Sequence, residues 1–118
     1  IVDDIIEQLK IDFYAVTKEK ISPLNYWGHI HEKNMSTNMH NHYDTYVSAV
    51  VYLKVPEGSG SIVFLPKFNQ YNNSAYKSKF SPERGVYYMF PGYLDHFVTR
   101  NMSDQFRISL SINFKKDE

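Results

Sequence analysis

Two pairs of histidines are the residues of this sequence best suited to chemistry. His29 and His31 form one pair and His40 and His42 the other, and each pair is spaced two residues apart. In a β-strand this spacing places both side chains on one face, where two imidazoles can reach one metal ion. Iron, zinc and nickel all accept imidazole nitrogen. The fifth histidine, His96, lies far downstream.

The second pair has the stronger surroundings for a metal site. Asp44 follows His42 at the same alternate spacing, and an apolar, β-branched run begins directly afterwards. His96 follows a Pro-Gly turn at 91–92 and opens another such run. Two ligand sets therefore stay open. One is His42, Asp44 and His96, the two-histidine-one-carboxylate set of non-haem Fe(II) oxygenases. The other is the three-histidine set of His40, His42 and His96.

The first pair favours a more ordinary interpretation. His29 and His31 lie beside Trp27, and no further carboxylate or histidine follows at strand spacing. Short histidine motifs also arise by chance. We therefore expect both side chains to cover the outside of a strand.

The last apolar run alternates between two kinds of residue. Its polar positions are Arg107, Ser109, Ser111 and Asn113, and apolar residues occupy the positions between them. Such a polar face usually meets solvent, but it can also line the inside of a barrel. There the planar guanidinium of Arg107 would match a carboxylate in bidentate fashion.

Periodicity predicts the elements that must position these residues. Residues 1–20 are expected to form a helix, because apolar residues recur at helical spacing and acidic residues occupy the first turn. The polar segment 68–79 lacks a period and is expected to be a long surface loop, either a lid over substrate or plain surface. One helix followed by several short strands indicates a small sandwich or barrel. Strands are expected at 26–31, 45–55, 61–65, 85–90, 94–100 and 106–114.

Length and composition limit the functional classes. The 118 residues suffice for a single domain, 1–118. Lys and Arg total 13 and balance 13 Asp and Glu, which argues against a nucleic acid or an anionic membrane as partner. The absence of cysteine excludes disulfides, thiolate metal sites and a cysteine nucleophile. No apolar run reaches the ~20 residues of a membrane span, and no signal peptide is visible, so a cytoplasmic location is expected. A homo-oligomer through the apolar strands stays open.

Four stretches of the sequence carry a resemblance to a known family when they are taken in order. They are His40–His42, Ser48–Pro56, Phe90–His96 and Arg107–Phe114. Together they resemble the 2-oxoglutarate- and Fe(II)-dependent dioxygenases and, more narrowly, a small branch with a His-x-His motif that is found in marine bacteria and their phages. The resemblance covers about 26–114 and implies a double-stranded β-helix, the cupin-like jelly roll, after an N-terminal helix.

The resemblance also implies a metal site at the barrel mouth. Iron would be held there by His40, His42 and His96. Asp44 is then either an alternative ligand or a partner that accepts a hydrogen bond from His42. A carboxylate is the standard third ligand of the wider superfamily, whereas the narrower branch has histidine.

The co-substrate site is implied in the same way. Arg107 would hold the distal carboxylate of 2-oxoglutarate, with Ser109 and Tyr52 as hydrogen-bonding neighbours. The expected function is that of an Fe(II)- and 2-oxoglutarate-dependent dioxygenase that uses O₂ to oxidise, by hydroxylation, an unidentified substrate and releases succinate and CO₂. The alternative is a cupin-like metal- or ligand-binding jelly roll without oxygenase activity. Arg107 separates the two, since a metal site alone needs no arginine beside it.

Overall fold

The computed structural model of the chain describes residues 1–42, 44–65 and 78–118. One α-helix precedes the strands in this described part. No helix among these residues is long and apolar enough to cross a membrane. The elements are α1 (Val2–Thr17), β1 (Ile21–His31), β2 (Thr37–His40), β3 (Val47–Lys54), β4 (Ile62–Leu65), β5 (Ser78–Phe80), β6 (Tyr87–Pro91), β7 (Asp95–Val98) and β8 (Arg107–Lys116).

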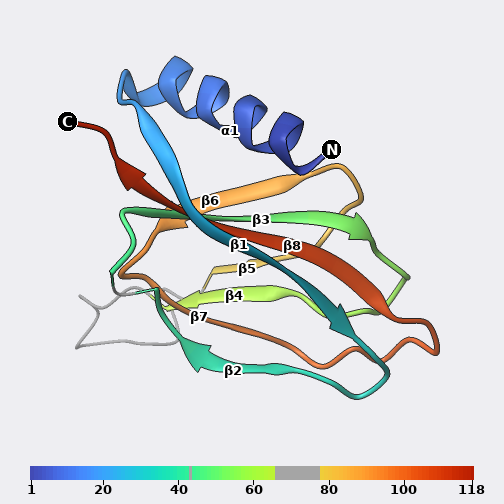
Figure 1. Cartoon of the computed structure of the whole chain (residues 1–118). Coiled ribbons are helices and arrows are strands. Elements are labelled where there is room, and N and C mark those ends of the chain that lie inside the picture. The colour runs from blue at the N-terminus through green and yellow to red at the C-terminus, as the bar shows by residue number, and fades with distance from the viewer. Residues whose placement is uncertain (43, 66–77) are drawn as a thin grey trace.

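The strands form two antiparallel sheets that face each other. One sheet has the order β1-β8-β3-β6, and the other has the order β2-β7-β4-β5. Figure 1 shows α1 on the outer side of the first sheet and the second sheet on its inner side. Most strands that follow one another in the sequence thus lie in opposite sheets, and each sheet pairs strands that are distant in sequence, as in a jelly roll. The predicted fold class, a mainly β jelly roll with an N-terminal helix, is confirmed.

The core has two layers because β8 buries both of its faces. Leu110, Ile112 and Phe114 pack with Ile6 and Leu9 of α1 on the helix side. On the other side a smaller cluster fills the space between the sheets, and it contains Val50, Tyr52, Ile62, Phe64 and Phe90. The alternation that the sequence shows in 106–114 therefore separates a helix-facing surface from a surface that faces the second sheet.

The helix ends three residues before the predicted boundary at Lys20. Lys18 adopts a left-handed backbone conformation with φ of 60°, and its N–H donates to the carbonyl of Tyr14 over 2.8 Å. This left-handed cap ends the helix before Ser22 and Pro23 are reached.

Two short strands were not predicted, and β1 is longer than predicted. β1 begins at Ile21 rather than at residue 26, because its N-terminal half pairs with the end of β8. β2 is polar and largely exposed, so it carries no alternating pattern. β5 occupies the end of the loop predicted at 68–79, and the rest of that loop lies outside the described residues.

Candidate metal centre and adjoining pocket

Three histidine rings meet near one end of the space between the sheets. His40 at the end of β2 lies opposite His96 of β7 in the strand register, and His42 follows β2 directly. One ring nitrogen from each histidine lies within 4.8 Å of the other two. The ring centroids are 4.3 Å apart for His40 and His96 and 5.1 Å apart for His42 and His96. Three imidazoles at this spacing could hold one metal ion.

Hydrogen bonds leave the same nitrogen free in two of these rings. Nδ1 of His40 donates to the carbonyl of Asn38 over 2.8 Å, and Nδ1 of His96 donates to the carbonyl of Leu94 over 3.0 Å. A carbonyl oxygen can only accept, so each Nδ1 carries the proton. Each Nε2 therefore keeps its lone pair for a metal.

His42 is oriented in the same way by a buried side-chain amide. Its Nδ1 donates to Oδ1 of Asn113 over 2.6 Å, and the hydroxyl of Ser48 donates to the same oxygen over 2.8 Å. The Nδ2 of Asn113 donates in turn to Oδ1 of Asn25 over 2.9 Å. These bonds fix the amide orientation and hence the His42 tautomer. Alternation along β8 places Asn113 on the polar face of its strand, but nothing in the local sequence indicates this role.

Asp44 does not join the histidine cluster. Its side chain lines the same pocket but is exposed, and it is not part of the group of close ligand atoms found among the described residues. The expected hydrogen bond from His42 to Asp44 is replaced by the bond to Asn113.

The Pro-Gly turn before β7 braces the backbone of His42. The N–H of His42 donates to the carbonyl of Gly92 over 2.8 Å, and the N–H of Gly92 donates to the carbonyl of Tyr46 over 3.1 Å. A Cβ atom on Gly92 would lie 1.9 Å from the carbonyl oxygen of Thr45 and 2.7 Å from that of His42. Only glycine allows the two turns to approach this closely.

Burial favours the uncharged form of two of these imidazoles, those of His42 and His96. Desolvation lowers the pKa of His96 to about 4. Desolvation also lowers the pKa of His42, against the hydrogen bond to Asn113 that raises it. Only the neutral imidazole can bind a metal, so burial holds His42 and His96 in their ligating form at pH 7.

A cavity of about 430 Å³ extends from the histidine cluster between the sheets. The polar face of β8 lines it, as the barrel-interior interpretation of this strand predicted. Its lining also includes Tyr52 of β3 and Trp27 of β1. The members of the β8 face are Arg107, Ser109, Ser111 and Asn113.

Arg107 is a buried cation without a counter-charge in the described part of the chain. Its side chain is 2% exposed, and burial lowers its pKa. Nη1 donates to the carbonyl of Ser59 over 3.1 Å, whereas Nε has no hydrogen-bond partner. None of the ion pairs among the described residues includes it. A buried charge is normally paired, so this guanidinium suits an anionic ligand in the cavity.

Two of the predicted neighbours of Arg107 lie beside it. Tyr52 and Ser109 are cross-strand partners on β3 and β8. Burial raises the pKa of Tyr52 to about 12, so its hydroxyl stays protonated and can donate. Arg107, Ser109 and Tyr52 thus bring three side chains that can donate hydrogen bonds to one wall of the cavity.

His29 and His31 face the cavity, so the expectation that they cover the outside of a strand is wrong. Both line the cavity, and His31 is 5% exposed. The cause is the register of β1, which sets His29 opposite Ser109 and His31 opposite Arg107 on the inward face of β8. The Nε1–H of Trp27 donates to Nε2 of His29.

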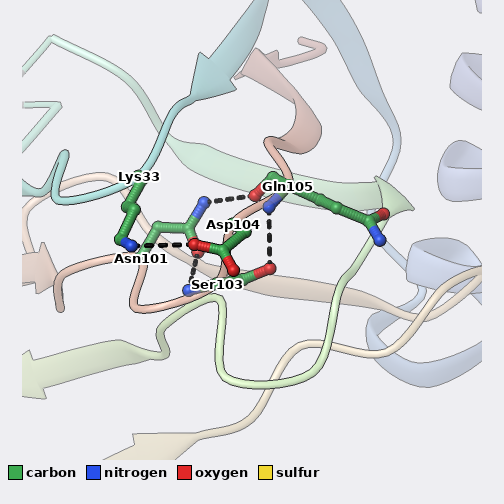
Figure 2. A network of polar contacts seen from close by, with 5 residues as sticks. All are labelled: Lys33, Asn101, Ser103, Asp104 and Gln105. Carbon is green, nitrogen blue, oxygen red and sulfur yellow. Dashed lines mark hydrogen bonds and ion pairs between the residues drawn. The ribbon is translucent and has the colours of Figure 1, made fainter.

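A turn built around one buried side chain, Asn101, ties the end of β1 to the start of β8. Figure 2 shows the Asn101 side chain at its centre and the ion pair between Lys33 and Asp104 at its side. Nδ2 of Asn101 donates to the carbonyls of Gln105 and His31, each over 2.9 Å. This fully buried amide fixes the backbone of His31 next to the strand that carries the buried arginine.

Comparisons with known proteins agree with this geometry. Residues 25–113 match the model of a family described as "Putative 2OG-Fe(II) oxygenase". No match was found among curated proteins. A 2OG-Fe(II) oxygenase-family oxidoreductase from Burkholderia pseudomallei superposes with a TM-score of 0.75 at 18% identity, over 90% of this chain and 51% of that one. A Pseudomonas putida prolyl-4-hydroxylase gives 0.68 at 17% identity, over 95% and 62%.

A third solved structure is the non-haem α-ketoglutarate-dependent epimerase SnoN from nogalamycin biosynthesis. It superposes with a TM-score of 0.74 at 14% identity, over 91% of this chain and 54% of that one. The chain thus spans between half and two thirds of the length of these three proteins. At these identities the superpositions show the fold, whereas the family match covers most of the chain. The chain belongs to the 2OG-Fe(II) oxygenase family.

Proposed function

We propose that the chain is the catalytic jelly roll of an Fe(II)- and 2-oxoglutarate-dependent oxygenase. It would oxidise a substrate, by hydroxylation, and release succinate and CO₂. The observation that carries the proposal is the combination of two features in one cavity: three imidazoles with free Nε2 atoms, and the buried guanidinium of Arg107, which has no counter-charge among the described residues. A metal site alone does not explain a buried arginine without a counter-charge.

The proposed iron ligands are the Nε2 atoms of His40, His42 and His96. Their Nδ1 atoms donate to oxygen acceptors, which orients the rings and makes the opposite nitrogens better ligands. Iron and 2-oxoglutarate, once bound, supply the oxidising chemistry. The chain supplies ligand geometry and a cavity that shields the reaction. We place Asp44 outside the ligand set, which supports membership of the branch with a His-x-His motif.

The proposed co-substrate site lies on the inner face of β8. Arg107 would bind the distal carboxylate of 2-oxoglutarate through its planar fork. Ser109 and the protonated hydroxyl of Tyr52 would donate further hydrogen bonds. The cavity joins this wall to the histidine cluster, so one small dicarboxylate could contact both.

Anaerobic titration of the protein with Fe(II) and 2-oxoglutarate tests the proposal. We expect a weak visible charge-transfer band that needs both components, because the keto acid would chelate the bound iron. Arg107→Leu should abolish the band at moderate 2-oxoglutarate concentration and leave Fe(II) binding unchanged. Tight binding of metal with no effect of 2-oxoglutarate would instead support a cupin-like metal-binding protein without oxygenase activity.

A further inference from the structure

Three buried polar side-chain atoms lack a hydrogen-bond partner in the described part of the chain. They are Nδ1 of His31, Oγ of Ser59 and Nε of Arg107. All three residues belong to one neighbourhood. Arg107 donates to the carbonyl of Ser59, and it lies opposite His31 in the β1–β8 register. Buried polar atoms are normally paired, so unpaired atoms grouped around one guanidinium indicate a position that binds a polar ligand.

The position of His31 is held at two points. Its Nε2 is hydrogen-bonded to Oγ1 of Thr37 over 2.8 Å, and its backbone carbonyl accepts from Nδ2 of Asn101 over 2.9 Å. The ring is 5% exposed and lines the same cavity as Arg107. Neither contact uses Nδ1, which therefore stays available to a molecule in the cavity.

We infer that His31 is a second residue that binds the distal carboxylate of 2-oxoglutarate, with its Nδ1–H donating beside the Arg107 guanidinium. The inference rests on the proposed function, since it needs that carboxylate to lie at Arg107. The hydroxyl of Thr37 can donate to Nε2, and this places the ring proton on Nδ1. A neutral imidazole then adds a directed donor without a second charge. His31 would thereby favour a 2-oxo diacid over a 2-oxo monoacid.

Three substitutions separate this role from a packing role. Asn at position 31 places an N–H donor at the δ position of the side chain, whereas Gln places it at the ε position and Phe provides none. Each variant would be loaded anaerobically with Mn(II), and its affinity for two keto acids measured by calorimetry. The first is 2-oxoglutarate, and the second is 2-oxopentanoate, which has a methyl group in place of the distal carboxylate.

We expect His31→Gln and His31→Phe to weaken 2-oxoglutarate binding about ten- to a hundredfold, the loss of one hydrogen bond to a charged group. Their affinity for 2-oxopentanoate should not change. His31→Asn should restore most of the 2-oxoglutarate affinity. Variants that weaken both keto acids equally, or an unchanged preference in both His31→Gln and His31→Phe, would overturn the inference.

Arg107→Met distinguishes failure of this inference from failure of the proposed function. If Arg107→Met loses the preference for the diacid while the His31 variants keep it, the inference alone is wrong. If the unsubstituted protein shows no preference for 2-oxoglutarate over 2-oxopentanoate, the proposed function is wrong. ¹⁵N NMR of the unsubstituted protein gives a test without variants: 2-oxoglutarate should fix the proton on Nδ1 of His31, and an unprotonated Nδ1 in the complex would overturn the inference.

Discussion

Nδ1 of His42 donates to Oδ1 of Asn113 over 2.6 Å, although the two residues lie 71 positions apart in the chain. The bond joins the turn after β2 to the middle of the opposite sheet. Asn113 in turn is held by Ser48 and Asn25. The orientation of one proposed metal ligand thus depends on three strands of the sheet that does not carry it.

Replacing Asn113 tests this dependence. Asn113→Ala should weaken metal binding about 10–100-fold, the usual effect of removing a partner of a ligating histidine. Asn113→Asp keeps an acceptor for Nδ1 of His42, so this variant should bind metal at least about tenfold more tightly than Asn113→Ala. Competition with a chromophoric chelator measures both affinities. Equal affinities in the two variants would show that the hydrogen bond does not orient His42.

The ligand set itself is tested by two histidines that line the same cavity. His96→Ala should abolish stoichiometric metal binding, because it removes one of three nitrogens that lie within 4.8 Å of each other. His29→Ala is the matched control and should keep one metal per chain, since its Nε2 is already bonded to Trp27. Metal analysis after gel filtration gives the stoichiometry. Full iron affinity in His96→Ala would refute the assignment.

His40 and Asp44 allow the two ligand sets of the sequence analysis to be compared directly. His40→Ala should remove the metal, whereas Asp44→Ala should change the affinity by less than about threefold, the usual range for substitution of an exposed side chain outside the site. Three neutral imidazoles leave the charge of Fe(II) uncompensated. Metal and 2-oxoglutarate should therefore each strengthen binding of the other. Loss of metal in Asp44→Ala with full retention in His40→Ala would restore the facial triad with a carboxylate.

The sequence predicted the face of β8 but not that of β1, and the reason is physical. On β8 the apolar and polar positions differ so clearly that only one face can meet the helix, as Leu110 and Ile112 do. Alternation along β1 shows which residues share a face, but it does not show which face is inside. His29 and His31 face inward because of their pairing with β8, a contact between distant segments.

Side-chain roles that depend on contacts between distant segments could not be predicted from the sequence, for the same reason. The His-x-His spacing and the position of His96 predict a cluster, and the structure brings these three residues together. The hydrogen-bond partner of His42 was expected to be Asp44, two residues further along, because alternate spacing puts an acceptor there on the same face. Asn113 takes that place only after the two sheets have closed.

Gly92→Ala should separate the turn that contains His42 from the Pro-Gly turn at 91–92. The added methyl group would overlap the carbonyl of Thr45, so the His42 turn must move. We expect the free energy of unfolding to fall by about 1–3 kcal/mol, as for other overpacked sites, and metal affinity to fall with it. Urea denaturation and chelator competition measure the two effects. Gly28→Ala is a suitable control, because its φ is not positive and a Cβ there would meet only the carbonyl oxygen of Ser109, at an ordinary contact distance of 3.9 Å.

The metal-free protein should lose stability as the pH falls below about 6.5. Burial lowers the pKa of both His31 and His96 to about 4 from the ordinary 6.5. Between these values the unfolded chain binds more protons than the folded chain, so the free energy of unfolding rises with pH across this window. Each histidine should contribute on the order of 2 kcal/mol of stability at pH 7 that is lost by pH 4.

Urea denaturation in EDTA at pH 7.5 and pH 5 measures the difference in the free energy of unfolding. His31→Gln should reduce that difference markedly, since it removes one of the two histidines whose pKa burial lowers most. A stability that is independent of pH between 7.5 and 5 would show that neither ring is kept neutral by the fold.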